Sequence, residues 1–151
     1  MIRMETLSLK TLDEVYELEQ KCFPDDPWGR LSFENELENS LSVFLVAIDE
    51  EKQKVVAYGG VWLVYDIGEI TNIAVHPDYR REGIGKRILS LLIDVCKEKD
   101  MSGITLEVRE SNTAAKQLYQ NEGFVCCGLR KKYYQGIEDA IIMTLEFNKE
   151  E

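Results

Sequence analysis

The chain has 151 residues, enough to bury most of its unfolded surface in one core, so the sequence predicts one domain at 1–147 and a charged tail at 148–151. Its 28 acidic and 18 basic residues give a formal net charge of −10, which disfavours a nucleic-acid surface and suits a cationic partner. No apolar run approaches the roughly 20 residues of a membrane span, and the N-terminus lacks a signal-peptide core. We therefore expect a cytoplasmic protein that binds neither nucleic acid nor membrane.

The cysteines offer no metal site. They show no Cys-x-x-Cys spacing, and the chain has a single histidine, so we expect free thiols and no bound metal. The four residues are Cys22, Cys96, Cys126 and Cys127.

Two helices are predicted near the N-terminus. Apolar residues at helical spacing predict a helix over 11–23, with a capping box made by Thr11 and Glu14. A loop rich in proline follows, and a second short helix is expected over 32–39, capped by its first residue. Trp28, in the loop, either closes the edge of the core or forms a wall of a substrate site.

A hairpin and a further strand come next. Two β-branched runs, 42–48 and 55–65, are joined by a charged turn and predict an antiparallel hairpin. Gly59-Gly60 in the second run indicates a bulge or a close approach by another group. The strand at 69–76 ends at His76-Pro77, where the proline cannot continue a ladder and the histidine has a structural role.

The clearest functional signal follows that strand. Gly83 and Gly85 lie at the entrance of an apolar-periodic helix that runs to about Lys99, where the first N–H groups lack partners and the helix dipole attracts phosphate. Arg80 and Arg81 add positive charge. The pattern predicts a diphosphate-binding loop, although the residues alone also allow a simple turn with solvated arginines. No Lys-Ser or Lys-Thr follows the second glycine, so the loop is not a nucleotide P-loop.

The last third of the chain predicts a strand, a helix and a hairpin. The strand at 104–109 alternates strictly between apolar and polar residues. Asn112 opens a helix over 113–121 that Gly123 closes. Two strands, 124–134 and 137–147, flank a turn at Gln135-Gly136, so the whole chain is a mixed α/β protein.

The strand, the Arg-x-x-Gly-x-Gly loop and the helix together resemble the acetyl-coenzyme-A (acetyl-CoA) loop of the GNAT acetyltransferase superfamily. Longer strings resemble its bacterial ribosomal-protein alanine N-acetyltransferases: Cys22-Phe23, Pro27-Trp28, Leu106-Glu107-Val108-Arg109, Ser111 to Ala115, Leu118-Tyr119, Glu122 to Phe124, Arg130 to Tyr134 and Glu138 to Met143. The resemblance implies the GNAT fold, a single domain with a mixed, mostly antiparallel central sheet, flanking helices and a splayed cofactor cleft.

The resemblance also implies roles for individual residues. Glu107 would be the general base and Tyr119 the general acid, although from the residues alone they read as a solvent-facing strand residue and a core tyrosine. By strand alternation rather than by the resemblance, Glu69 shares a face with Ile73 and Val75 and is a second possible base, although a surface carboxylate at the start of the strand is the preferred interpretation. Tyr133 and Tyr134 at the last hairpin are, with Trp28, candidate walls for a peptide. The expected cofactor-binding residues are Ile73, Ala74, Val75, Arg81, Glu82, Gly83, Ile84, Gly85, Lys86 and Asn112.

The implied activity is acetyl transfer from acetyl-CoA to the N-terminal α-amine of a protein, with a ribosomal protein beginning with alanine as acceptor. Transfer would be direct, in a ternary complex, because no cysteine lies in a recognisable nucleophile motif. Two alternatives stay open: acetylation of a small-molecule amine or a lysine side chain, and a CoA-binding module without catalysis. The short turn at 135–137, which would help to frame an acceptor peptide, leaves the acceptor open.

Overall fold

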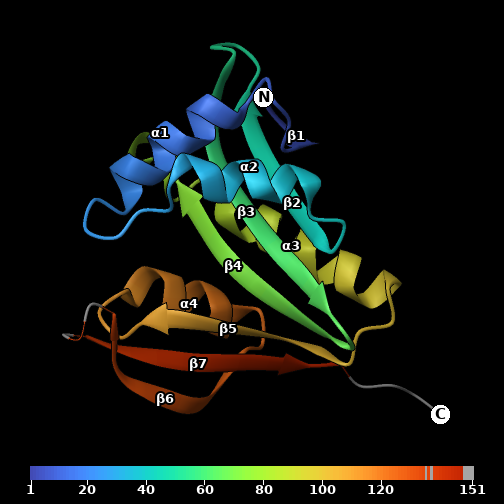
Figure 1. Cartoon of the computed structure of the whole chain (residues 1–151), viewed down its shortest axis with the longest axis vertical. Helices are drawn as coiled ribbons and strands as arrows, with labels where there is room; N and C mark the ends of the chain where they lie inside the picture. Colours follow the sequence, from blue (N-terminus) through green and yellow to red (C-terminus); the bar gives the residue numbers. More distant parts are fainter. Residues whose placement is uncertain (135, 137, 148–151) are drawn as a thin grey trace. The chain divides into compact units, whose positions relative to one another are not determined.

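The computed structural model describes residues 1–134, 136 and 138–147. Its strands form a mixed, mostly antiparallel sheet in the order β1-β2-β3-β4-β5-β7-β6 (Figure 1). The strands are β1 Ile2–Thr6, β2 Ser42–Asp49, β3 Lys54–Val64, β4 Ile67–Val75, β5 Gly103–Arg109, β6 Val125–Tyr134 and β7 Glu138–Glu146. The helices are α1 Leu12–Cys22, α2 Arg30–Glu38, α3 Ile84–Glu98 and α4 Thr113–Asn121, with a short 3-10 turn, η1, at Pro77–Tyr79.

The chain divides into two compact units. The first unit holds Met1–Trp62 and Thr71–Leu92, and the second holds Leu63–Ile70 and Ile93–Glu151. The predicted domain at 1–147 stays a prediction, as does the cofactor cleft. The expected tail at 148–151 and residues Gln135 and Ile137 of the expected turn lie outside the described residues.

In the first unit, α1 and α2 cover one face of β2 and β3 (Figure 1), where apolar helix and strand residues share a core. Phe33 of α2 is fully buried and meets Phe44 and Tyr58 edge-on, each at 5.9 Å between ring centroids. Edge-to-face pairs add about 0.5–1.5 kcal/mol each beyond the burial of area. The aromatic cluster therefore fixes the second helix on the sheet.

The glycine pair in β3 is a close approach, as one of the two predicted alternatives had it. A Cβ on Gly59 would lie 2.7 Å from Ile88 of α3, and a Cβ on Gly60 would lie 2.6 Å from Phe44. Successive residues of a strand point to opposite faces, so each glycine admits packing on its own side of the sheet. The register shift is instead in β2, between Ala47 and Ile48.

In the second unit, the predicted alternation of β5 is confirmed. Ile104, Leu106 and Val108 are buried, whereas the residues between them are half-buried. β5 pairs antiparallel with β7, which pairs antiparallel with β6, and its start pairs parallel with β4. Polar residues of β5 therefore lie in the same antiparallel part of the sheet as those of β6 and β7.

Three local predictions were wrong. The strand β1 was missed, because five residues with two charged side chains give a weak signal. The second helix starts at Arg30 rather than at Ser32. Arg30 forms ion pairs with Asp13 of the first helix and with Glu34, four positions later in its own helix.

The predicted capping box of the first helix is also absent. The Thr11 hydroxyl bonds the backbone of Ser8, at 3.2 Å from its nitrogen and 3.3 Å from its oxygen. The Glu14 carboxylate instead accepts the N–H of Val55 at 2.8 Å. The Glu14 carboxylate therefore accepts from a backbone N–H that is distant in sequence instead of from the N–H of Thr11.

Within the described ranges, none of the helices is long and apolar enough to cross a bilayer. The same residues contain no group of three His, Cys, Asp or Glu side chains placed to hold a metal ion.

Candidate active site

The predicted phosphate loop is a strained turn that leads into α3. Arg81 has φ +67° and Gly83 has φ +80°, both in the left-handed region. The N–H of Arg87 donates to the Gly83 carbonyl at 3.0 Å, which closes the first turn of the helix. A Cβ on Gly83 would meet nothing within 4 Å, so this face of the loop is open to a ligand. Backbone N–H groups in such a turn, ahead of a long helix, attract anions.

The side chains of the loop divide into anchors and exposed charges. Ile84 is buried, while Arg81, Glu82, Gly83 and Lys86 are exposed and Gly85 is half-buried. Arg80 is exposed, and its Nε donates to the Val75 carbonyl at 3.1 Å. The exposed cations of the predicted cofactor set, Arg81 and Lys86, therefore flank the open glycine.

The backbone of β4 leads directly into this loop. Ala74 is buried, and Ile73 and Val75 are half-buried. The Val75 carbonyl also accepts from the Cys22 thiol at 3.7 Å, and His76 caps η1 by accepting the Asp78 N–H on Nδ1 at 3.1 Å. The structural role predicted for His76 agrees with this contact, and the first unit brings the expected pantetheine strand and phosphate loop together.

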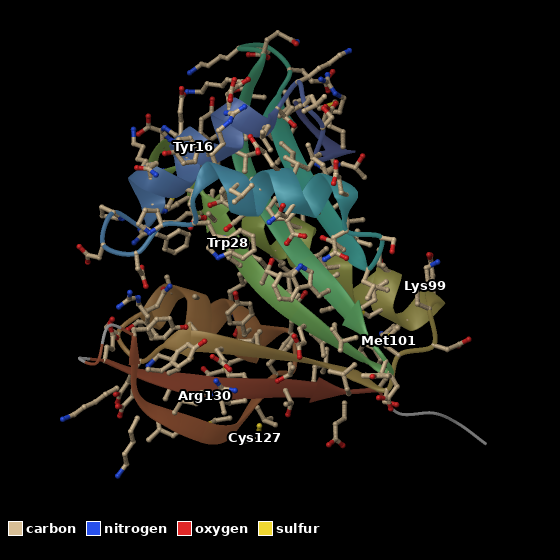
Figure 2. The ribbon with its side chains drawn as sticks, viewed as in Figure 1. Tyr16, Trp28, Lys99, Met101, Cys127 and Arg130 are labelled. Atoms are coloured by element: carbon tan, nitrogen blue, oxygen red, sulfur yellow. The ribbon has the colours of Figure 1, made fainter. Side chains whose placement is uncertain are left out.

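Glu107 lies on the polar face of β5, with 27% of its side chain exposed. Its Oε1 is 3.1 Å from Nε of Arg130 on β6, an ion pair that the sequence did not predict. Glu107 and Gly128 both pair with Ile142 of β7, and Arg130 lies two positions after Gly128 on β6. Figure 2 labels Arg130 over this part of the sheet. The basic cluster at 130–132 was the sequence feature that could have indicated a cationic partner for Glu107.

Tyr119 is buried on α4, and its ring lies 5.7 Å from that of Phe124. Burial, with a smaller contribution from Tyr134, raises the pKa of the Tyr119 phenol well above its usual range. The phenol therefore keeps its proton at neutral pH. Because it is a weaker acid than an exposed tyrosine, hydrogen-bond donation is favoured over complete proton transfer.

Asn112 caps α4, as predicted: its Oδ1 accepts the N–H of Ala115 at 3.1 Å. The residue before it is fastened to β7, because Glu138 accepts the N–H of Ser111 at 2.7 Å and pairs with Arg109 at 3.0 Å. Hydrogen bonds from the Ser111 side chain and backbone, and then Arg109, hold the pKa of Glu138 below its usual range. The start of α4 thus depends on an ionised carboxylate.

This dependence gives a prediction for acid stability. A carboxyl whose pKa is lowered by folding stabilises the protein above its unfolded pKa, about 4.3 for Glu, and the stabilisation is lost as pH falls through the folded value. Glu138→Gln should therefore flatten the fall in the melting temperature between about pH 5 and pH 3. Melting curves across this range test it, with exposed Glu110→Gln as the control. Parallel curves for wild type and Glu138→Gln would rule it out.

Glu69, the second candidate base, belongs to the same unit as Glu107. It pairs with Thr105 in the parallel ladder of β4 and β5. Paired residues point to one face, and Thr105 and Glu107 are two positions apart on β5, so both carboxylates lie on one face of these strands. The arrangement keeps Glu69 as an alternative to Glu107.

The expected peptide walls have separate contacts. Trp28 lies beneath α2 in the view of Figure 2 and packs against Phe33 at 5.3 Å and Trp62 at 6.3 Å between ring centroids, which supports its role at the core edge. The rings of Tyr133 and Tyr134 contact each other, with 5.2 Å between their centroids. Guanidinium groups lie over both rings, Arg130 at 5.1 Å from Tyr133 and Arg109 at 4.4 Å from Tyr134. A role for the three aromatic residues in binding a peptide stays a prediction.

Sequence reasoning also missed a buried carboxylate beside Trp28. Glu19 is 2% exposed; its Oε1 accepts from the Tyr58 hydroxyl and from Asn72 at 2.9 Å, and its Oε2 accepts the Trp28 N–H at 2.9 Å. Burial raises the pKa of Glu19. Glu19 lies four positions after buried Val15, within the apolar stripe of α1. A carboxylate at that position could have indicated a buried acid.

Comparison with known proteins agrees with this geometry. The model of the acetyltransferase (GNAT) family matches residues 12–124. A Bacillus subtilis (strain 168) protein, provisionally named a ribosomal protein bS18-alanine N-acetyltransferase, is 39% identical over 148 residues, covering 97% of this chain and 96% of its own.

Two solved structures are similar. The ribosomal-protein-S18-alanine N-acetyltransferase from Escherichia coli has a TM-score of 0.89 at 32% identity, over 100% of this chain and 97% of its own. Arabidopsis thaliana NAA60 in complex with acetyl-CoA shares the fold, with a TM-score of 0.87 at 18% identity over 99% of this chain and 100% of its own. The expected fold and the N-acetyltransferase class are confirmed. The chain belongs to the acetyltransferase (GNAT) family.

Proposed function

We propose that this chain transfers the acetyl group of acetyl-CoA directly to the N-terminal α-amine of a protein, and that the acceptor is a ribosomal protein of the bS18 kind beginning with alanine. The observation that carries the proposal is the 39% identity, over 97% of the chain, to a protein named for that reaction. The cytoplasm is the compartment where such an acceptor is made.

The first unit would hold the co-substrate. The N–H groups at the start of α3 and the exposed cations Arg81 and Lys86 would bind the diphosphate, and the open face of Gly83 would let it approach the backbone. The β4 backbone at Ile73, Ala74 and Val75 would lie along the pantetheine and donate an N–H to the thioester oxygen. The resemblance also assigns Asn112, the N-cap of α4, to binding of the co-substrate.

Glu107 and Tyr119 would supply the proton chemistry. The amine nitrogen attacks the thioester carbon, its proton passes to the Glu107 carboxylate, and the bond to sulfur breaks as the amide forms. Tyr119 would donate a hydrogen bond to the departing sulfur. An α-amine has a pKa near 8, against about 10.4 for lysine, so it reaches the neutral, nucleophilic form more readily. The chemistry therefore favours a chain terminus over a side chain.

The test is thiol release from acetyl-CoA with three acceptors: a peptide with the alanine-starting bS18 sequence, the same peptide with a blocked N-terminus and an internal lysine, and spermidine. We expect release with the free N-terminus alone, above a control without acceptor. Release with spermidine or the lysine peptide alone would identify a different amine as acceptor. Tight CoA binding with no release from any of the three would identify a non-catalytic module.

A further inference from the structure

The phosphate loop is held from its N-terminal side by a buried hydrogen bond. Tyr79, the last residue of η1, donates its hydroxyl to Oδ2 of Asp49 at 2.5 Å. Both residues are buried, Tyr79 at 8% and Asp49 at 9% exposure. The amines of Lys52 and Lys54 lie 5.9 Å and 5.4 Å from the centre of the Tyr79 ring. A residue adjacent to the loop is thus fixed to a hairpin that is distant in sequence.

Asp49 is itself fixed. It ends β2, and its Oδ1 accepts the N–H groups of Glu51 at 3.0 Å and Lys52 at 3.3 Å, so one carboxylate closes the β2–β3 turn and receives Tyr79. The Tyr79 hydroxyl holds the pKa of Asp49 below its usual range, and Asp49 raises the pKa of Tyr79 to about 12. The hydrogen bond therefore joins an ionised acid to a neutral phenol throughout the neutral pH range.

The loop needs anchors because its backbone is strained. Arg81 is a non-glycine residue at φ +67°, two positions after Tyr79. Such a conformation persists only where the surroundings hold it. At the far end, Arg87 donates its N–H to Gly83 at 3.0 Å and its Nη1 to the Ile2 carbonyl at 3.0 Å. At the near end, Tyr79 is the buried anchor, and Arg80 adds an exposed contact to Val75.

We propose that Tyr79 and Asp49 are positioning residues for the co-substrate: their hydrogen bond keeps the Arg81–Lys86 loop in its anion-binding conformation. The inference rests on the proposed function, because it assumes that this loop binds CoA. It follows that loss of the bond lowers the population of the binding-competent loop without changing the residues that react. Affinity for CoA depends on the bond, and the rate at saturation does not.

Tyr79→Phe tests this, because it removes one hydroxyl and keeps the ring. If the loop is then competent about one tenth of the time, the Kd for CoA rises about tenfold and the KM for acetyl-CoA follows it, with kcat unchanged. Asn has one side-chain oxygen where Asp49 uses two, so it cannot accept both from the turn N–H groups and from Tyr79, and Asp49→Asn should also raise the Kd. The matched control is Thr11→Val, which also deletes one buried hydroxyl in the first unit, away from the loop, and should leave the Kd unchanged.

Calorimetric titration with CoA and melting curves of the four proteins decide the question. A selective rise in Kd for Tyr79→Phe, at a melting temperature no lower than that of Thr11→Val, supports the proposal. If wild type binds CoA and both Tyr79→Phe and Asp49→Asn bind equally well, the inference is overturned while the proposed function stands. If wild type does not bind CoA, the proposed function is the one that fails. Should Tyr79→Phe not fold, Asp49→Asn alone decides.

Discussion

Replacing Glu107 by Gln should reduce kcat for an alanine-starting peptide by about 10²–10⁴-fold, the range over which general bases contribute. Gln is close to Glu in shape, and its amide oxygen can still accept from Arg130, which lies 3.1 Å away in the wild type. The substitution therefore removes the basic oxygen and keeps the position of the side chain. The Kd for CoA should not change, since the cofactor residues are elsewhere.

Initial-rate assays of peptide acetylation give kcat, and calorimetric titration gives the Kd for CoA. Glu110→Gln is the matched control, because Glu110 is an exposed carboxylate three positions later in the chain. Glu69→Gln tests the second candidate base, which shares a strand face with Glu107. Full turnover in Glu107→Gln together with loss in Glu69→Gln would transfer the role of base to Glu69.

The parts of the site that depend on local pattern could be predicted. Alternation placed Glu107 on the polar face of β5, and the Asn112 cap and the glycine loop follow from residue type and spacing. Each of these features is decided by neighbours within a few positions. The catalytic roles came from the resemblance, because nothing in the residues alone separates Glu107 from an ordinary solvent-facing carboxylate.

The partners of these residues could not be predicted. Arg130 is 23 positions from Glu107 and reaches it because β7 lies between β5 and β6 in the sheet, an order that the chain sequence does not reveal. Tyr79 and Asp49 are 30 positions apart, and Glu19 and Asn72 are 53 apart. Such contacts depend on register and tertiary packing, which also displaced the predicted capping box of α1.

Tyr119→Phe should lower kcat by about 10²-fold, at the low end of the range for general acids. Burial raises the pKa of this phenol, so it donates a hydrogen bond to the sulfur more easily than it transfers its proton. Removing a hydrogen-bond donor lowers kcat less than removing a full proton donor does. The ring contact with Phe124 remains, so the melting temperature should change little. Tyr65→Phe, at a side chain that is 96% exposed, is the matched control.

The pH dependence separates this role from that of an ordinary tyrosine. An exposed phenol ionises near pH 10, where it would cease to donate. Because the pKa of Tyr119 lies higher, its contribution, measured as the ratio of wild-type to Tyr119→Phe kcat, should stay constant from about pH 7 to pH 10. A ratio that falls toward one within this range would show that the phenol titrates normally and that its burial does not persist in the reacting complex. Equal kcat values for the two proteins at every pH would show that the sulfur departs without help from Tyr119.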